Sequence, residues 1–263
     1  MEKLKKELDF GVFYTCFTEY ESVEYSLDVL YSIYPEIPVY LISDGGSDYS
    51  DLKNKFKNAE FLLEYDSRGM VPKINTTNWL QPEMQEIMKD SIVTFLERIK
   101  RAIEYCKKPY LLIMEPDVLV RGKLSIEEGV DLLGSRVNHY HWAKDRVNLV
   151  LDRIPGSIHV SHYGATPAIF KSESFMKVYD FFKANPSYID EFCKIDSNFS
   201  NYDILITVMF AALGYDEIQN PELTECLRNP NWRNSGHPLL HQFREYYPTS
   251  NYSGRHSVSR NNG

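Results

Sequence analysis

The first fifty residues contain a strand, a helix and a second strand in direct succession, and this order restricts the fold more than any other feature. Phe10–Phe17 is a run of aromatic and β-branched residues, which is typical of a strand. Glu21–Tyr34 has apolar residues near helical spacing and stops before Pro35. Pro38–Ser43 is a second apolar run, followed by the turn-forming letters SDGGSD. A βαβ unit of this kind implies parallel strands joined by a right-handed crossover.

Two further strands and a long helix extend this unit. The letters AEFLLEYD (residues 59–66) predict a third strand, and apolar residues at helical spacing predict a helix from about Met84 to Cys106. Tyr110–Met114 is a continuous apolar run, typical of a strand covered on both faces. We therefore expect an α/β fold with a Rossmann-like, mixed but mainly parallel central sheet flanked by helices. The carboxyl ends of strands one, two and four then meet at one edge, where such sheets bind ligands.

The remaining segments have a less regular pattern. The first ten residues predict a short amphipathic helix, and a further helix is expected to begin near Ser125. The letters HYGATPAIFKSESFMKVYDFF predict a turn, a strand and an amphipathic helix, and NYDILITVMFAALGYDEI predicts an apolar helix that ends at Gly214. We expect one domain over residues 1–249, with a nucleotide-binding half at about 10–120 and an acceptor-binding half at about 121–249. Residues 250–263 form a polar tail that is expected to be mobile.

Composition argues against several classes of function. The formal net charge of −8 speaks against binding nucleic acid through a basic face. The chain has no run of the roughly 18 apolar residues that a membrane span needs, and no apolar segment follows the basic start as in a signal peptide. Four scattered cysteines without C-x-x-C spacing indicate neither a zinc site nor a disulfide framework. The expected location is therefore cytoplasmic.

Two carboxylates, Glu115 and Asp117, follow the Tyr110–Met114 strand with Pro116 between them. In an extended segment, side chains two residues apart face the same side, so both carboxylates can face one cation. Magnesium and manganese commonly take one or two protein carboxylates together with substrate phosphate oxygens. The alternative is a surface β-turn with proline at its second position.

The strand–helix–strand unit ending LISDGGSD, followed by the long helix and LLIMEPDVLV, resembles the GT-A fold nucleotide-sugar glycosyltransferases of the family-2-like type. The resemblance covers about Phe10–Val120 well and Gly164–Tyr247 more loosely. It implies a metal-dependent hexosyl- or pentosyltransferase. Such an enzyme moves a sugar from a nucleotide-diphosphate sugar, with a UDP-sugar favoured, to a hydroxyl of a glycan or glycoconjugate. Glu115 stands where these enzymes usually carry the first Asp of an Asp-x-Asp motif, which keeps an oxygen ligand but alters its reach.

The resemblance also implies the donor side of the site. Glu115 and Asp117 would hold Mn²⁺ or Mg²⁺, joined by His241 with His237 as the alternative. Contacts to the base, the ribose and the diphosphate would come from Thr18, Glu19, Asp44, Arg68, Lys73 and Arg244. Within this set Asp44 would bond the base, with Asp48 as a second candidate for that contact. Thr18 and Glu19, after the first strand, would lie along the base or ribose, and the basic residues would contact the diphosphate. The alternative for SDGGSD is a simple loop, since its residues are standard turn formers.

On the acceptor side, Asp203 opens the apolar helix and would take the proton from the attacking hydroxyl as general base, which predicts inversion. An aspartate in the first turn also caps a helix, and both roles can hold together. If no base lies beneath the acceptor, a retaining mechanism is the better inference. The letters HYGATPAIF resemble the small-residue turn that lies behind the donor sugar in this family, and a plain β-turn is the alternative. In the resemblance Gly164 and Ala165 would lie at the donor sugar, and His162 and Tyr163 would border the acceptor.

Two other functions stay open on the sequence alone. A nucleotidyltransferase shares a nucleotide-binding α/β layout and metal carboxylates, but its Gly-rich basic signature is replaced here by TEYESVEYS. A catalytically silent sugar- or nucleotide-binding domain of the same fold is favoured by Glu115 in place of Asp. Hydrolysis of a donor sugar in the presence of Mn²⁺ would exclude the silent domain.

Overall fold

The computed structural model describes residues 5–64, 80–137, 144–161, 163–195, 202–219, 224–225 and 234–241. Its largest sheet contains β2 (Phe10–Cys16), β3 (Val39–Asp44), β4 (Ala59–Glu64), β5 (Tyr110–Met114), β8 (Leu132–Val137), β9 (Tyr163–Lys171) and β10 (Glu217–Gln219). The helices are α1 (Tyr20–Ile33), α2 (Pro82–Cys106), α3 (Lys144–Leu151), α4 (Ser172–Ala184), α5 (Ser187–Cys193) and α6 (Tyr202–Ala212), with a 3₁₀ helix η1 (Ser50–Asn54).

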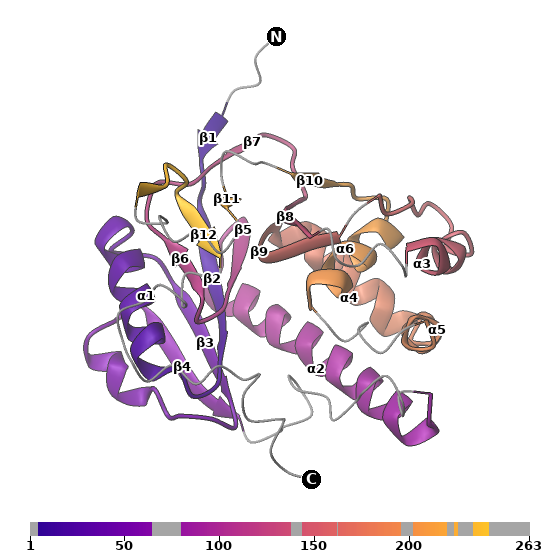
Figure 1. The fold of residues 1–263 in the computed structure, drawn as a ribbon, viewed down its shortest axis with the longest axis horizontal. Helices are drawn as coiled ribbons and strands as arrows, with labels where there is room; N and C mark the ends of the chain where they lie inside the picture. Colours follow the sequence, from indigo (N-terminus) through magenta and orange to yellow (C-terminus); the bar gives the residue numbers. More distant parts are fainter. Residues whose placement is uncertain are drawn as a thin grey trace.

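The seven strands lie in the order β10-β8-β9-β5-β2-β3-β4 (Figure 1). Strands β4, β3, β2 and β5 are parallel neighbours, as the sequence predicted. Strand β9 is antiparallel to both β5 and β8, and β10 is parallel to β8, so β9 alone in this sheet runs the opposite way. The predicted mixed but mainly parallel sheet is therefore confirmed.

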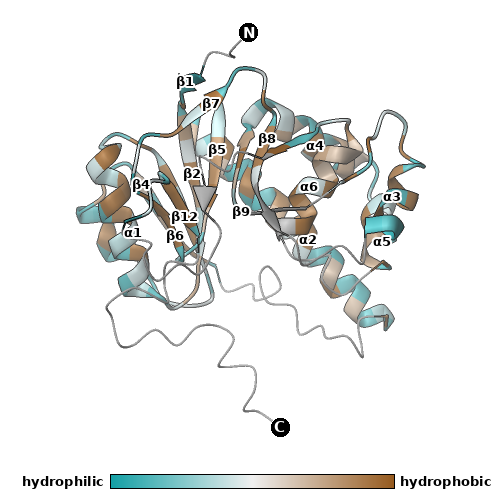
Figure 2. Cartoon of the chain, turned by 45° about the horizontal axis from the view of Figure 1, so that its top comes forward, coloured by the Kyte–Doolittle hydropathy of each residue, from teal (hydrophilic) through white to brown (hydrophobic). Residues whose placement is uncertain are grey.

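Alternation along the central strands explains why helices cover both faces of the sheet. Phe13 and Ile113 belong to the core that includes the buried face of α2, whereas Val12, Tyr14 and Leu112 belong to the core beneath α1. Every residue of β2 is buried, as expected for a central parallel strand. In Figure 2 both α1 and α2 carry hydrophobic and hydrophilic residues, as helices with one face on a sheet do.

Two segments that the sequence predicted as helices are strands, and those predictions were wrong. The N-terminal segment forms β1 (Lys5–Glu7) and the Ser125 segment forms β7 (Ser125–Glu127), and the two pair antiparallel with Lys6 opposite Ile126. The Leu8 N–H also donates to the Leu124 carbonyl at 2.9 Å. A helix this short gains little from its own hydrogen bonds, so pairing between two distant segments is the more stable arrangement.

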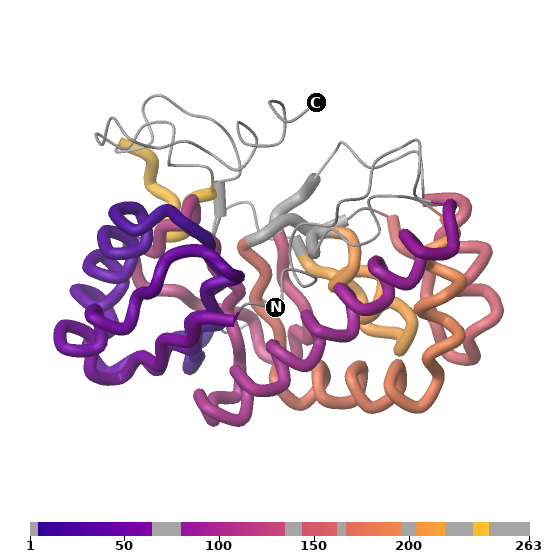
Figure 3. Tube along the Cα trace, turned by 90° about the horizontal axis from the view of Figure 1, so that it is seen from below, coloured from indigo at the N-terminus to yellow at the C-terminus, as the bar shows by residue number. Residues whose placement is uncertain are grey.

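A small three-stranded sheet lies over α1. It consists of β11 (Thr224–Glu225), β12 (Leu239–His241) and β6 (Val118–Val120), with β12 antiparallel to β6. Leu119 and Leu240 pack together with Tyr25 and Val29 of α1. Figure 3 shows the result: the yellow β12 segment lies on the same side of the molecule as the indigo N-terminal elements. None of the described helices has the length and apolar character to span a membrane.

Candidate metal and nucleotide site

The carboxylates after β5 sit in a tight turn. The Val118 N–H donates to the Glu115 carbonyl at 2.9 Å, which closes a β-turn with Pro116 at its second position. The expectation of an extended segment was therefore wrong, and the turn alternative is correct in its geometry. It is not a surface turn, however, because Asp117 is only 3% exposed and Glu115 is half-buried.

The pairing of β12 with β6 brings His241 to this turn. His241 lies opposite Val118 in the antiparallel register, one residue from Asp117. Arg121 secures the approach of this segment, since its backbone N–H donates to the Pro238 carbonyl at 2.8 Å and its Nε donates to the His237 carbonyl at 2.9 Å. Position 241, rather than the alternative at 237, is thus the histidine beside the carboxylates.

Glu115, Asp117 and His241 offer potential ligand atoms that all lie within 4.8 Å of one another. The Nε2 atom of His241 is 3.7 Å from Oδ1 of Asp117, too far for a hydrogen bond. Two ligands about 2.1 Å from one ion are about 3 to 4.2 Å apart, so the separation suits a shared ion. The two carboxylates supply oxygen ligands, which suit both Mg²⁺ and Mn²⁺, and the imidazole adds a nitrogen ligand, which suits a transition metal such as Mn²⁺ better than Mg²⁺. The residues therefore fit the predicted divalent cation. Within the described ranges no other group of three such side chains converges in this way.

The loops after β2 and β3 are locked together at the same edge of the sheet. The Phe17 carbonyl accepts hydrogen bonds from the Ser47 N–H at 2.7 Å, the Tyr49 hydroxyl at 3.2 Å and the Ser43 hydroxyl at 3.3 Å. A Cβ atom on Gly46 would lie 2.0 Å from this same carbonyl oxygen. Glycine is therefore required at position 46 by the close approach of the two backbones.

The predicted nucleoside contacts in these loops differ in how they are presented. Oε2 of Glu19 accepts the backbone N–H groups of Phe17 at 3.2 Å and Thr18 at 2.9 Å, so this carboxylate is turned onto its own loop and is 8% exposed. Thr18 itself is exposed. Asp48 is exposed too, and accepting the Ser50 N–H at 2.8 Å lowers the pKa of its carboxyl. The roles of these residues toward a ligand stay predictions.

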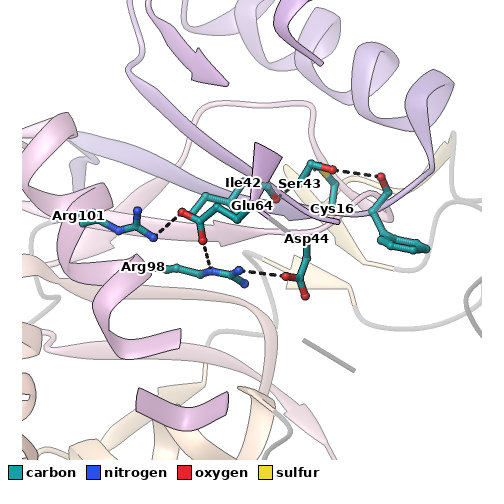
Figure 4. Close-up of polar contacts among 8 residues, drawn as sticks. Cys16, Ile42, Ser43, Asp44, Glu64, Arg98 and Arg101 are labelled. Atoms are coloured by element: carbon teal, nitrogen blue, oxygen red, sulfur yellow. Dashed lines mark hydrogen bonds and ion pairs between the residues drawn. The ribbon is translucent and has the colours of Figure 1, made fainter. Parts of the chain in front are cut away.

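Asp44 ends β3 directly opposite Glu64, the last residue of β4, and a buried arginine joins the two (Figure 4). Nη2 of Arg98 donates to Asp44 at 2.9 Å and Nε donates to Glu64 at 2.8 Å, while Arg101 donates to the other oxygen of Glu64 at 2.7 Å. Burial lowers the pKa of the Arg98 guanidinium, but the two carboxylates outweigh it and raise that pKa. Sequence reasoning missed Arg98, although a cation three residues after Phe95 on the apolar face of a helix was the available signal.

The other predicted site residues are placed less completely. Gly164 and Ala165 lie within β9, opposite Arg136 and Ser135 of β8, so the predicted small-residue turn is wrong; the β8 ladder holds this segment extended. Asp203 is the second residue of α6, as expected for a residue that opens the helix.

Four predicted site residues lie outside the described part of the chain, so their predicted roles stay untested: Arg68, Lys73, His162 and Arg244. The side chains of Asp203, Tyr163 and Ala165 lie outside it as well.

Comparison with known proteins identifies the fold. No protein-family model matches the sequence, and comparison with curated protein sequences gives no match. Among solved structures, an active-site mutant of LgtC is similar with a TM-score of 0.57 and 14% identity over 88% of this chain and 86% of that one. The galactosyltransferase LgtC in complex with donor and acceptor sugar analogues is similar with a TM-score of 0.54 and 15% identity over the same shares. The chain therefore has the GT-A-like fold of glycosyltransferases.

Proposed function

We propose that the protein is a metal-dependent glycosyltransferase that takes a sugar from a nucleotide-diphosphate sugar, with a UDP-sugar favoured. The acceptor would be a hydroxyl of a glycan or glycoconjugate. The observation that carries the proposal is the convergence of Glu115, Asp117 and His241 at the carboxyl edge of a GT-A-like sheet. A catalytically silent domain does not require a histidine beside these two carboxylates, which precede it by more than a hundred residues in the sequence.

The residues of the cluster would act by holding a cation beside the donor diphosphate. A bound divalent cation would neutralise the charge that develops on the leaving diphosphate. Asp117 and His241, being buried, would be held in fixed positions by β5, β6 and β12, and Glu115 would supply the more accessible oxygen. The locked loops after β2 and β3 would give the nucleoside a rigid support, which lowers the entropy cost of binding.

For the acceptor side, we propose Asp203 as the general base that takes the proton from the attacking hydroxyl. Its place in the first turn of α6 supports this role, because α6 packs against β9, the strand next to β5. Reaction with a base in this position gives a product of inverted anomeric configuration. Proton NMR of the first product formed reads that configuration directly, and a retained configuration would rule out Asp203 as the base.

The test of the proposed function compares wild type with Asp117→Asn and with Asp9→Asn as a matched control. Asp9 is exposed at the opposite edge of the sheet, where it pairs with Lys108, so its loss leaves the site intact. Release of UDP from a panel of UDP-sugars is measured with Mn²⁺ and with EDTA. We expect turnover by the wild type and the control only with Mn²⁺, and a loss of at least about 100-fold in Asp117→Asn. Absence of turnover and of nucleotide binding for every donor would leave a silent domain instead.

A further inference from the structure

We propose that a cavity between α2, α4 and α5 is a binding site for a single hydrocarbon chain with an anionic head, as in a free fatty acid. The cavity has a volume of about 250 Å³ and opens to solvent beside Val93, which is 42% exposed. Figure 1 shows α4 and α5 beside α2, and both helices pack against it. No residue that lines this cavity belongs to the candidate metal and nucleotide site, so the inference does not depend on the proposed function.

The floor of the cavity is apolar and comes from all three helices and the turn between two of them. Leu96, Phe182 and Ile189 are each at most 4% exposed, and Val93 and Pro186 complete the apolar lining. An apolar ligand that fills this space removes its own surface and that of the lining from water, which is favourable. A methylene group has about the volume of one water molecule in the liquid, roughly 30 Å³, so the cavity holds a chain of about eight carbons.

The polar groups at the mouth of the cavity are bonded to one another. The Tyr179 hydroxyl donates to Glu97 and accepts a hydrogen bond from Nζ of Lys183 at 3.2 Å. A polar ligand such as a sugar would have to break these bonds to make its own, and the apolar floor would leave its inner hydroxyls unpaired. A hydrocarbon chain has no such cost, so it suits this cavity better.

The charge at the mouth indicates the head of the ligand. The ammonium group of Lys183 has three donors and uses one of them on Tyr179, and within the described residues no carboxylate oxygen lies within ion-pair distance of it. The ammonium group of Lys100 is also near, 5.8 Å from the centre of the Tyr179 ring, but it is paired with Glu104 at 2.8 Å. Lys183 is therefore the cation that is available to an anionic head.

The surroundings of the mouth favour a free amphiphile over a bilayer surface. Besides the Lys100–Glu104 pair on α2, Lys89 of α2 pairs with Asp190 of α5 at 2.9 Å. A face that enters a bilayer presents a broad apolar surface, and burying these ion pairs in lipid would require their desolvation. The arrangement thus suits a chain that enters the protein, and does not suit a protein face that enters a membrane.

The experiment records methyl NMR spectra of the whole chain, labelled at its isoleucine, leucine and valine methyl groups. The probes are octanoate, 1-octanol with a neutral head on the same chain, and acetate with the head alone. The proteins are wild type, Val93→Asp, Lys183→Met and Leu149→Asp. Leu149 is 61% exposed on α3 and outside the cavity, so its variant is the matched control for a new charge at an exposed apolar position. A cooperative thermal transition shows that each variant is folded.

We expect octanoate to shift the methyl signals of Val93, Leu96 and Ile189 in wild type to saturation, and acetate to shift none of them. Val93→Asp places a charge in the apolar cavity and should weaken octanoate binding by at least about 10-fold, whereas Leu149→Asp should keep it within about twofold. Lys183→Met should weaken octanoate binding by about two- to fivefold and leave the binding of 1-octanol unchanged, because only octanoate carries a charge.

Four results would overturn the proposal. Absence of any octanoate shift at the cavity in wild type would show that it is not a site for such a chain. Octanoate shifts as large at Leu149 as at Val93 would show general adsorption to exposed apolar residues. An equal effect of Lys183→Met on octanoate and 1-octanol would remove the anionic head. If vesicles of phosphatidylglycerol bind the protein through this face while octanoate does not, the face docks on a membrane instead.

Discussion

Replacing Gly46 by Ala should separate the two loops that we propose support the nucleoside. The added Cβ would lie 2.0 Å from the carbonyl oxygen and 2.3 Å from the carbonyl carbon of Phe17, where ordinary contacts begin at 3.4 Å. The backbones must therefore move apart by about 1.4 Å, because no flexible side chain can turn out of the way. That movement also breaks the 2.7 Å hydrogen bond from the Ser47 N–H to the Phe17 carbonyl.

The expected loss is about 3 kcal/mol of unfolding free energy, roughly 2 from overpacking and 1 from the hydrogen bond. For a chain of this size the thermal midpoint should fall by about 6 to 12 °C. Differential scanning calorimetry measures this, with two glycine controls. Gly129 has φ +87° and open space around it, so Gly129→Ala should cost only about 1 kcal/mol of backbone strain. Gly236 has open space and no left-handed φ, so Gly236→Ala should be nearly neutral. Equal midpoints for Gly46→Ala and Gly236→Ala would refute the locked loops.

Three further predictions concern single side chains. His241→Phe, which keeps a ring but removes the ligand nitrogen, should weaken Mn²⁺ binding in an EPR titration by at least about 10-fold, while exposed His159→Phe should leave it unchanged. Asp203→Asn should lower kcat by about 10²- to 10⁴-fold with little change in donor KM, and an unchanged kcat would restrict Asp203 to capping α6. Burial raises the pKa of Cys106 from 9.0 to about 12. Above pH 9 the thiol ionises in the unfolded chain but stays neutral in the folded protein, which favours unfolding. The stabilisation that Cys106 gives should therefore be complete below pH 9 and be lost between pH 9 and 12, and urea unfolding of wild type and Cys106→Ala across this range measures it.

The local sequence pattern was sufficient to predict the parallel strands β2 to β5 of the sheet and the helices α1 and α2 between them. The strand at Tyr110–Met114 was predicted at its observed bounds, and the long helix was predicted with its observed end at Cys106 and a start two residues after the observed Pro82. Both were predictable because their apolar patterns depend on residues that are neighbours in the sequence. The short strands β1, β7 and β12 were not predicted as strands. Each has only three residues and depends on a partner more than a hundred residues away, which leaves no local periodicity to detect.

The candidate site was predicted in the same uneven way. Glu115 and Asp117 stood out because carboxylates directly follow an apolar strand. His241 was reached only through a family resemblance, since its place beside Asp117 depends on the β6–β12 register. Arg98 was missed because its burial is tolerated only through Asp44 and Glu64, which end two other elements. The sequence of one helix does not show which of its charged residues will pair with carboxylates on other elements of the fold.

The central claim is a metal-dependent site for a nucleoside diphosphate, and one measurement addresses it most directly. The thermal midpoint of the protein is recorded against rising UDP, with Mn²⁺ and without it, for wild type and Asp117→Asn. A ligand that binds only the folded state at 100 times its dissociation constant adds about 2.7 kcal/mol, or about 5 to 11 °C here. The account predicts such a rise for wild type with Mn²⁺ and none for Asp117→Asn. Equal midpoints with and without Mn²⁺ at saturating UDP would contradict it.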